Sequence, residues 1–282
     1  MPVTTTGRDV PGAWAGPLWV REAGAGPPLL LLHGAGAGGD VFGLLAPRLV
    51  DHCRILIPDL RGHGRGGSLP GPLGAEAVAA DLAPALDALG VESVHILGHS
   101  HGGAAAQAFA RDHPDRVRSL VLVGAYTIQR LSRWERAAGL LAPPIVEALG
   151  AGRLAWLIHR SRSAGGGRRL SPDAAAILAA LVAENDAGRV AAALRAARPF
   201  DSRGWLEKIR VPTLVVAGAA DHVVSPEQAR LLAAGIPRAR LRVLPDGGHM
   251  LPLSHPAELA AILMEWLDAA GTGRAGTGPT PS

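Results

Sequence analysis

The segment Gly98-His99-Ser100-His101-Gly102 has the residue types and spacing that can turn a serine hydroxyl into a nucleophile. It lies between an apolar segment of strand length, 94–97, and a segment of helical character, 101–111. A sharp turn from strand to helix brings backbone atoms close together and strains the central residue, so the positions two before and two after it must be small. The hydroxyl would stand above a helix N-terminus, whose free N–H groups favour developing negative charge. We therefore predict that Ser100 is a catalytic nucleophile.

A serine nucleophile needs a base that removes its proton, and the base needs an acid that holds its tautomer. Asp221 follows the apolar segment 214–216, and His249 follows the apolar segment 241–244. Both would lie just beyond the carboxyl end of a strand, and the chain order serine, acid, histidine is the one that accompanies a nucleophile turn of this kind. We predict Asp221 as the acid and His249 as the base, with Asp246 as the alternative acid.

The tetrahedral intermediate of acyl transfer also needs hydrogen-bond donors for its oxyanion. Backbone N–H groups of the residue after the nucleophile and of an early strand-to-helix loop normally supply them. These positions are His101 and Ala35, the latter within the glycine-rich segment 33–39. That segment lacks the Gly-Lys-Ser/Thr ending of a phosphate loop and the glycine spacing of a dinucleotide site. We expect no nucleotide cofactor.

The elements that must position these residues alternate along the chain between strand length and helix length. Each apolar run ends in a glycine-rich or polar turn. The alternation predicts an α/β fold, with a mainly parallel sheet flanked by helices on both faces. The predicted strands are 18–20, 29–32, 54–57, 94–97, 117–123, 212–216 and 241–244, and the predicted helices are 75–89, 101–111, 228–234 and 257–269.

The alternation stops between 126 and 205, where the chain is helical in character and interrupted by proline and glycine clusters. An insertion at this point would cover the carboxyl ends of the strands, which is where open parallel sheets bind their ligands. We therefore predict a core formed by 1–125 and 206–270 and a helical cap at 126–205. The tail 271–282 is rich in glycine, threonine and proline, lacks large apolar side chains, and is predicted to be disordered.

The composition excludes several function classes. Formal net charge is only +4, and no basic run is interleaved with aromatic residues, so we expect no nucleic-acid partner. Cys53 is the only cysteine, which excludes an internal disulfide and a thiolate-rich metal site, and we expect no metal. The first 20 residues contain no continuous apolar run, which predicts a cytoplasmic protein without a signal peptide or membrane span. Neither composition nor motifs indicate an oligomeric state.

Together these motifs resemble those of the α/β-hydrolase superfamily, and the matches extend from Leu29 to about Trp266. The resemblance implies an α/β-hydrolase fold and is specific for fold and triad, whereas it says little about the substrate. The matching motifs are His33-Gly34 for the oxyanion loop, Asp59-x-Arg61-Gly62-x-Gly64 for the next glycine loop, Gly98-His99-Ser100-His101-Gly102-Gly103 for the nucleophile turn, Gly218-x-x-Asp221 for the acid loop and Gly248-His249 for the base loop.

The resemblance implies hydrolysis of a small molecule with an acyl carbonyl, a carboxylic ester or lactone, through an acyl-enzyme. Thioesters and amides fit the same machinery. Epoxide hydrolases and haloalkane dehalogenases of this fold carry aspartate where this chain has Ser100, so those activities are not implied. Carbon–carbon hydrolases usually have asparagine before the serine and tryptophan after the histidine, where this chain has His99 and Met250. A carbon–carbon hydrolase or lyase-like enzyme is the second hypothesis, and a non-catalytic small-molecule-binding protein the third.

The predicted cap is rich in arginine, with 12 arginines and 6 acidic residues between Tyr126 and Trp205. This excess could attract an anionic substrate, or it could consist of solvated side chains on amphipathic helices. Trp134, Trp156 and Trp205 could line an apolar pocket or pack the cap against the core. The sequence leaves both pairs of alternatives open.

Overall fold

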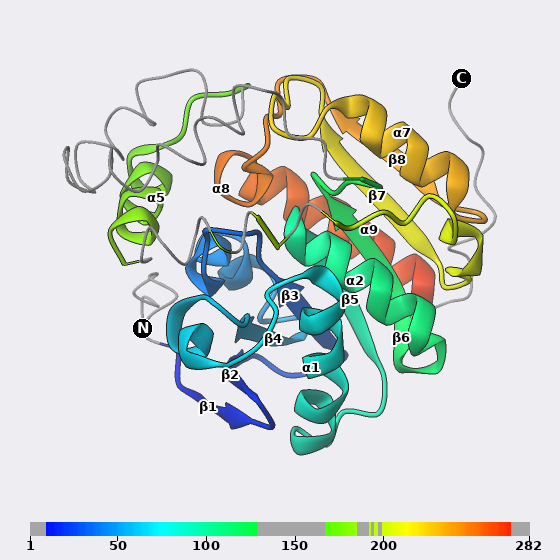
Figure 1. Ribbon diagram of the computed structural model, residues 1–282. Helices are drawn as coiled ribbons and strands as arrows, with labels where there is room; N and C mark the ends of the chain where they lie inside the picture. The colour runs from blue at the N-terminus through cyan, green and yellow to red at the C-terminus, as the bar shows by residue number, and fades with distance from the viewer. Residues whose placement is uncertain (1–9, 129–166, 185–191, 193–194, 197–198, 272–282) are drawn as a thin grey trace.

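The computed structural model describes residues 10–128, 167–184, 192, 195–196 and 199–271. In this part of the chain, a mixed sheet of eight strands forms the centre of the molecule (Figure 1). The order across the sheet is β1-β2-β4-β3-β5-β6-β7-β8. The strands are β1 (Gly12–Ala15), β2 (Leu18–Ala23), β3 (Pro28–Leu32), β4 (Arg54–Asp59), β5 (Val94–His99), β6 (Val117–Val123), β7 (Thr213–Gly218) and β8 (Arg240–Leu244).

The strands from β3 to β8 are parallel to their neighbours, whereas β1 and β2 form an antiparallel hairpin and β2 is antiparallel to β4. The sequence does not predict β1, because Gly12–Ala15 contains one large apolar side chain, Trp14, and so shows no alternation. Since β3 to β8 run in one direction, their carboxyl ends and the loops that follow them meet at one edge of the sheet. The predicted site residues lie in these loops.

Both faces of the central strands are buried, which explains why these strands appear in the sequence as continuous apolar runs. In β3, Leu30 and Leu32 belong to one hydrophobic cluster, and Leu29 and Leu31 belong to the other. Helices α1 (Ala75–Ala88), α2 (His101–Asp112) and α7 (Pro226–Gly235) contribute to the first cluster, whereas α8 (Leu251–Ser254) and α9 (Pro256–Gly271) contribute to the second (Figure 1). The predicted α/β architecture with helices on both faces is confirmed.

Of the predicted cap at 126–205, the structure describes both ends and helix α5 (Pro172–Glu184). Helix α5 lies against the 3-10 helix η1 (Gly39–Phe42), and its Ala174 and Leu181 join the second cluster. Most of the remaining predicted cap lies outside the described residues, so the division into core and cap stays a prediction. The same holds for the predicted disordered tail beyond Gly271, the last residue of α9. No described helix is both long and apolar enough to cross a membrane.

Candidate active site

Ser100 occupies a tight turn between β5 and α2. Its φ of 54° and ψ of −116° lie in a region that residues other than glycine rarely adopt, and its N–H donates to the carbonyl oxygen of Val123 on β6 at 3.0 Å. A Cβ on Gly98 would lie 2.6 Å from the carbonyl oxygen of Gly102, and a Cβ on Gly102 would lie 2.3 Å from that of Leu32. The backbone crowding expected of a nucleophile turn is therefore present.

The loops after β7 and β8 bring an acid and a histidine to Ser100. His249 Nε2 lies 3.1 Å from Ser100 Oγ, and His249 Nδ1 lies 2.8 Å from Asp221 Oδ2. Asp221 and His249 are both buried, whereas Ser100 is partly exposed. The three predicted site residues thus form a continuous chain of hydrogen bonds at the carboxyl edge of the sheet.

The second carboxylate oxygen of Asp221 is held by its own loop. Asp221 Oδ1 accepts the N–H groups of Val223 and Val224, each at 2.8 Å. Hydrogen bonds from backbone N–H groups stabilise an ionised carboxylate and fix its orientation. Asp221 can therefore hold the Nδ1 proton of His249, which leaves the Nε2 lone pair directed at Ser100.

The alternative acid, Asp246, has other partners. Asp246 Oδ1 lies 3.1 Å from Nε2 of His255, and Asp246 Oδ2 accepts from Arg168 Nε at 2.9 Å. The side chain of Asp246 is more than half exposed, whereas that of Asp221 is buried. Because His249 is hydrogen bonded to Asp221, the structure favours Asp221 as its acid.

A second histidine, His99, supports the backbone of His249. Its ring is buried, and its Nε2 lies 2.9 Å from the main-chain oxygen of His249. Since a carbonyl oxygen only accepts, Nε2 carries the proton and Nδ1 carries a lone pair. That lone pair has no hydrogen-bond partner among the described residues. Burial and the nearby His249 lower the pKa of His99 to about 3, so the ring is neutral near pH 7.

The two predicted oxyanion donors lie close to Ser100 in different loops. His101 is the first residue of α2, a position whose N–H has no acceptor within the helix. Ala35 follows Gly34, where an added Cβ would lie 3.1 Å from Ser100 Cβ. The loop with Ala35 therefore runs directly beside the nucleophile. That the N–H groups of Ala35 and His101 bind an oxyanion stays a prediction.

The His101 side chain joins the start of α2 to Leu73 and Tyr126, and these contacts are not predicted from the sequence. Its Nε2 donates to the carbonyl oxygen of Leu73 at 3.1 Å, and its Nδ1 lies 3.3 Å from the hydroxyl of Tyr126. Because Nε2 carries the proton, the Tyr126 hydroxyl donates to Nδ1. Burial, with a smaller contribution from His63, lowers the pKa of His101 to about 4. No feature of the sequence identifies Leu73 or Tyr126 as partners.

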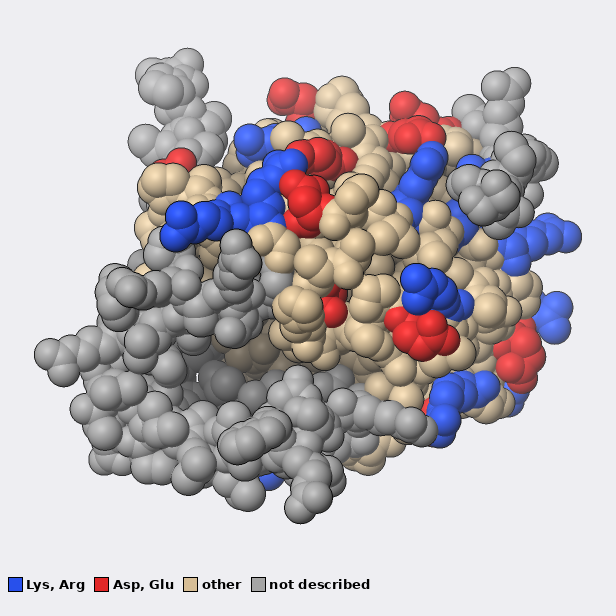
Figure 2. All heavy atoms as spheres, turned by 90° about the horizontal axis from the view of Figure 1, so that it is seen from above, with Lys and Arg blue, Asp and Glu red and all other residues tan. Residues whose placement is uncertain are grey.

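Two arginines of the predicted cap that the structure describes form ion pairs with acidic side chains. Arg168 pairs with Asp246 and Glu258, and Arg203 pairs with Asp201. The face seen in Figure 2 likewise shows basic and acidic side chains interspersed over the described residues. Trp205 packs edge-on against Phe200, with its ring under the guanidinium of Arg111, so for this tryptophan packing against the core is the role that the structure supports. Trp134 and Trp156 lie outside the described residues.

The described part of the chain contains no group of three or more histidine, cysteine, aspartate or glutamate side chains placed to hold a metal ion. Cys53 is buried and lies directly before β4. Apart from Nδ1 of His99, the polar side-chain atoms described above around Ser100 form hydrogen bonds with one another or with backbone groups. This arrangement can activate a hydroxyl and transfer protons.

Comparisons with known proteins show the family of this chain. Residues 29–262 match the model of the alpha/beta hydrolase family. A pimeloyl-acyl-carrier-protein methyl ester esterase from Neisseria meningitidis is 32% identical over 243 residues, which cover 84% of this chain and 76% of the relative. A putative carbamate hydrolase from Azorhizobium caulinodans is 32% identical over 260 residues, which cover 88% of this chain and 93% of the relative.

The fold is also similar to that of a thermophilic esterase from Thermogutta terrifontis, solved with malate bound. The two share 29% sequence identity with a TM-score of 0.75, over 90% of this chain and 94% of that chain. The family match covers most of β3, the strands β4 to β8, the turn at Ser100 and the loops that carry Asp221 and His249. This chain therefore belongs to the alpha/beta hydrolase family and is a hydrolase of that type.

Proposed function

We propose that this hydrolase cleaves a carboxylic ester through an acyl-enzyme formed on Ser100. The observation that carries the proposal is the chain of hydrogen bonds from Ser100 Oγ to His249 Nε2 at 3.1 Å and from His249 Nδ1 to Asp221 Oδ2 at 2.8 Å. Nucleophile, base and orienting acid in this arrangement are the requirements of acyl transfer. The names of two similar proteins, both esterases, support an ester as the substrate.

In the first half of the reaction, Ser100 Oγ attacks the acyl carbon and its proton passes to His249 Nε2. The carbonyl π electrons move onto oxygen, and the N–H groups of Ala35 and His101 bind this oxyanion. When the tetrahedral intermediate collapses, the bond to the leaving oxygen breaks and His249 returns the proton to that oxygen. Asp221 stabilises the imidazolium that forms between these steps.

In the second half, water attacks the acyl-enzyme. His249 takes a proton from the water, a second oxyanion forms in the same place, and its collapse breaks the bond between the acyl carbon and Ser100 Oγ. The proton returns to Ser100, and the carboxylic acid leaves. A lactone enters the same sequence as an intramolecular ester, so lactone hydrolysis forms part of the proposal.

The proposal also includes residues 126–205 as a cap that shapes the pocket for the acyl or leaving group. Support comes from the position of this segment after β6, whose carboxyl end lies beside Ser100. Ligands of open parallel sheets bind at this edge. The cytoplasmic location expected from the sequence stays a prediction, which cell fractionation would test.

A fluorophosphonate probe and a substrate panel test the proposed function. We expect the probe to label Ser100 in the purified protein and not in Ser100→Ala, and p-nitrophenyl esters or lactones to be hydrolysed. The panel includes thioesters, amides and aromatic ring-fission dienones. Turnover of dienones without ester hydrolysis would support the carbon–carbon hydrolase instead, and absence of labelling would contradict the serine mechanism.

A further inference from the structure

The loop that carries Ala35 is held by a buried histidine on its N-terminal side. His33 directly follows β3, and its ring is fully buried. His33 Nε2 accepts the N–H of Leu60 at 3.1 Å, and His33 Nδ1 lies 2.9 Å from the carbonyl oxygen of Gly34. Because Nε2 accepts, the proton is on Nδ1, and Nδ1 donates to Gly34. The two hydrogen bonds determine the tautomer of this ring.

A second buried histidine holds the other side of Ala35. His63 lies in the glycine loop after β4, and its Nε2 accepts the N–H of Gly36 at 2.9 Å. His63 Nδ1 donates to the carbonyl oxygen of Arg61 at 3.1 Å, so this ring also carries its proton on Nδ1. The two imidazoles contact each other edge to face, with centroids 4.9 Å apart. Burial lowers the pKa of both rings, which keeps them neutral near pH 7.

These contacts act on the two peptide units on either side of Ala35. The carbonyl of Gly34 and the N–H of Ala35 belong to one planar unit, and the described residues contain no cis peptide bond. In a trans unit the C=O and N–H groups point in opposite directions. A donor that holds the Gly34 oxygen therefore fixes the direction of the Ala35 N–H, and His63 fixes the next unit through Gly36.

We propose that His33 and His63 are positioning residues that aim the backbone N–H of Ala35 at the oxyanion. The inference rests on the proposed function, since it assigns to these histidines the preorganisation of the oxyanion site of that reaction. Electrostatic stabilisation depends on donors that are already oriented before charge develops. The hydrogen bonds of the two rings go to backbone groups and not to Ser100, His249 or Asp221, so their action passes through the loop at Ala35.

The motif Asp59-x-Arg61-Gly62-x-Gly64 holds the loop that carries His63. Asp59 Oδ2 accepts the N–H of Arg65 at 3.1 Å, and Asp59 Oδ1 accepts from Arg21 Nη2 at 3.2 Å and from the N–H of Gly39 at 3.5 Å. Asp59 thus ties the loop of His63 to the end of the loop that contains Ala35. These contacts keep His63 beside the loop that carries Ala35.

Replacing each histidine by asparagine and, in a second variant, by glutamine tests the hydrogen bonds of Nδ1 and Nε2 separately. The amide of asparagine reaches the position of Nδ1, and the amide of glutamine reaches that of Nε2. His33→Asn can keep the donor to Gly34, whereas His33→Gln keeps only the acceptor for Leu60. For His63 the assignment is reversed, because His63→Gln keeps the acceptor for Gly36 and His63→Asn does not.

The decisive measurement is the Ki of an aryl trifluoromethyl ketone, compared with kcat and KM for a p-nitrophenyl ester. Ser100 Oγ adds to the ketone carbon, its proton passes to His249, and the resulting oxyanion occupies the site used in ester hydrolysis. We expect His33→Gln and His63→Asn to lower kcat by about 100-fold and to weaken ketone binding in parallel, with KM little changed. His33→Asn and His63→Gln should restore most of both quantities.

Two controls separate an effect on the oxyanion site from an effect on folding. Rates are expressed per site labelled by fluorophosphonate, which removes the effect of unfolded protein. His95→Asn replaces another buried histidine, which bonds to Ser119 in β6, and should leave Ki and kcat unchanged even where it lowers the melting temperature. If both His33 variants fail to fold, the His63 pair decides.

Equal ketone affinity within a pair would overturn the inference, as would a loss confined to the melting temperature. These outcomes differ from failure of the proposed function. If fluorophosphonate does not label Ser100 in the unsubstituted protein, the serine mechanism itself is wrong. If it labels Ser100 and the paired variants behave alike, only the positioning role is wrong.

Discussion

The two oxygens of Asp221 have separate partners, and this separation determines what a substitution would do. Oδ1 accepts two backbone N–H groups, from Val223 and Val224, and Oδ2 accepts from His249. In an asparagine, an NH2 group replaces one of these two oxygens. Only one set of partners, either the pair of backbone N–H groups or His249, would then still face an oxygen. Because the backbone N–H groups require an acceptor, the NH2 group would face His249 Nδ1.

We expect Asp221→Asn to fold and to lower kcat by about four orders of magnitude. The NH2 group would favour the tautomer with the proton on His249 Nε2, which cannot accept the proton of Ser100. Steady-state hydrolysis of a p-nitrophenyl ester measures the loss. Asp246→Asn is the matched control, since Asp246 is exposed and paired with Arg168, and it should retain activity. The reverse result would identify Asp246 as the acid.

Gly34 leaves little room beside the nucleophile. A Cβ at this position would lie 3.1 Å from Ser100 Cβ and 3.3 Å from His99 Nδ1. We expect Gly34→Ala to shift Ser100 or the oxyanion loop by a few tenths of an ångström and to lower kcat by about tenfold or more. The rate of fluorophosphonate labelling should fall as well. Gly204→Ala, where an added Cβ meets nothing within 4 Å, is the control, and equal activity of the two variants would contradict the prediction.

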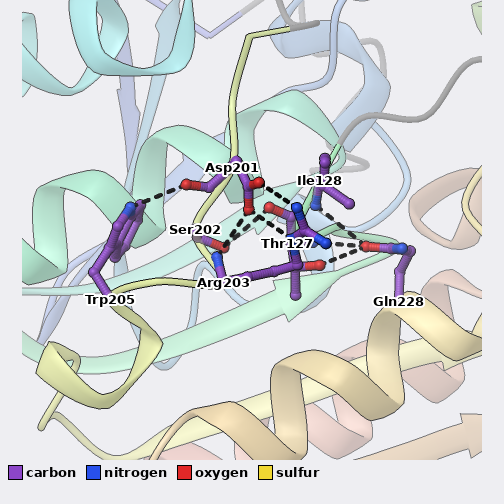
Figure 3. A network of polar contacts seen from close by, with 7 residues as sticks. All are labelled: Thr127, Ile128, Asp201, Ser202, Arg203, Trp205 and Gln228. Atoms are coloured by element: carbon purple, nitrogen blue, oxygen red, sulfur yellow. Dashed lines mark hydrogen bonds and ion pairs between the residues drawn. The ribbon is translucent and has the colours of Figure 1, made fainter.

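At the scale of elements, a polar network ties the two ends of the predicted cap to the core (Figure 3). Gln228 on α7 reaches across to the segment after β6, where its Oε1 accepts the N–H and hydroxyl of Thr127 and the N–H of Ile128. The C-terminal end of the predicted cap also bonds to Thr127, since the N–H of Ser202 donates to the Thr127 carbonyl oxygen at 2.8 Å. One amide oxygen therefore satisfies three donors at the base of the predicted cap.

We expect Gln228→Met to lower the free energy of unfolding by about 2 kcal/mol, because the buried Thr127 would lose the acceptor for its donors. Gln228→Glu keeps an oxygen at this position and should lose much less. Urea unfolding of the three proteins measures the difference. Equal stability of the methionine and glutamate variants would show that the network contributes packing and not hydrogen bonding.

Most of the strands and helices, though not β1 or α8, and the chain order of the candidate site residues could be predicted from the sequence, whereas most of the supporting contacts could not. Apolar runs that end in glycine-rich turns are local features, so strands such as Leu29–Leu32 and the turn at Ser100 are visible directly. The hydrogen bond from Gly36 to His63 joins residues that are 27 positions apart, and that from Thr127 to Gln228 joins residues 101 apart. Such pairs depend on which strands become neighbours, and no local pattern encodes that choice.

At the scale of the whole molecule, the described part of the chain contains five buried histidines whose pKa is lowered. Burial lowers the pKa of His95 and of His101 to about 4 and that of His99 to about 3, and it also lowers the pKa of His33 and His63. Smaller contributions come from Arg118 near His95, from His249 near His99 and from His63 near His101. In the unfolded chain these side chains would titrate near pH 6.5. The unfolded state therefore binds more protons than the folded state when the pH falls below that value.

This difference predicts that the contribution of these histidines to the free energy of unfolding is constant above about pH 7 and falls as the pH drops from 6.5 toward 4. Each such histidine contributes a slope of about 1.4 kcal/mol per pH unit in this window, or about 2 kcal/mol lost by pH 5. Urea midpoints measured between pH 8 and pH 4.5 test the slope. His95 lies away from Ser100. His95→Asn should reduce the slope by the contribution of one proton, about 1.4 kcal/mol per pH unit, whereas substitution of the exposed His52 should leave the slope unchanged. A slope that His95→Asn does not alter would mean that His95 is protonated in the folded protein.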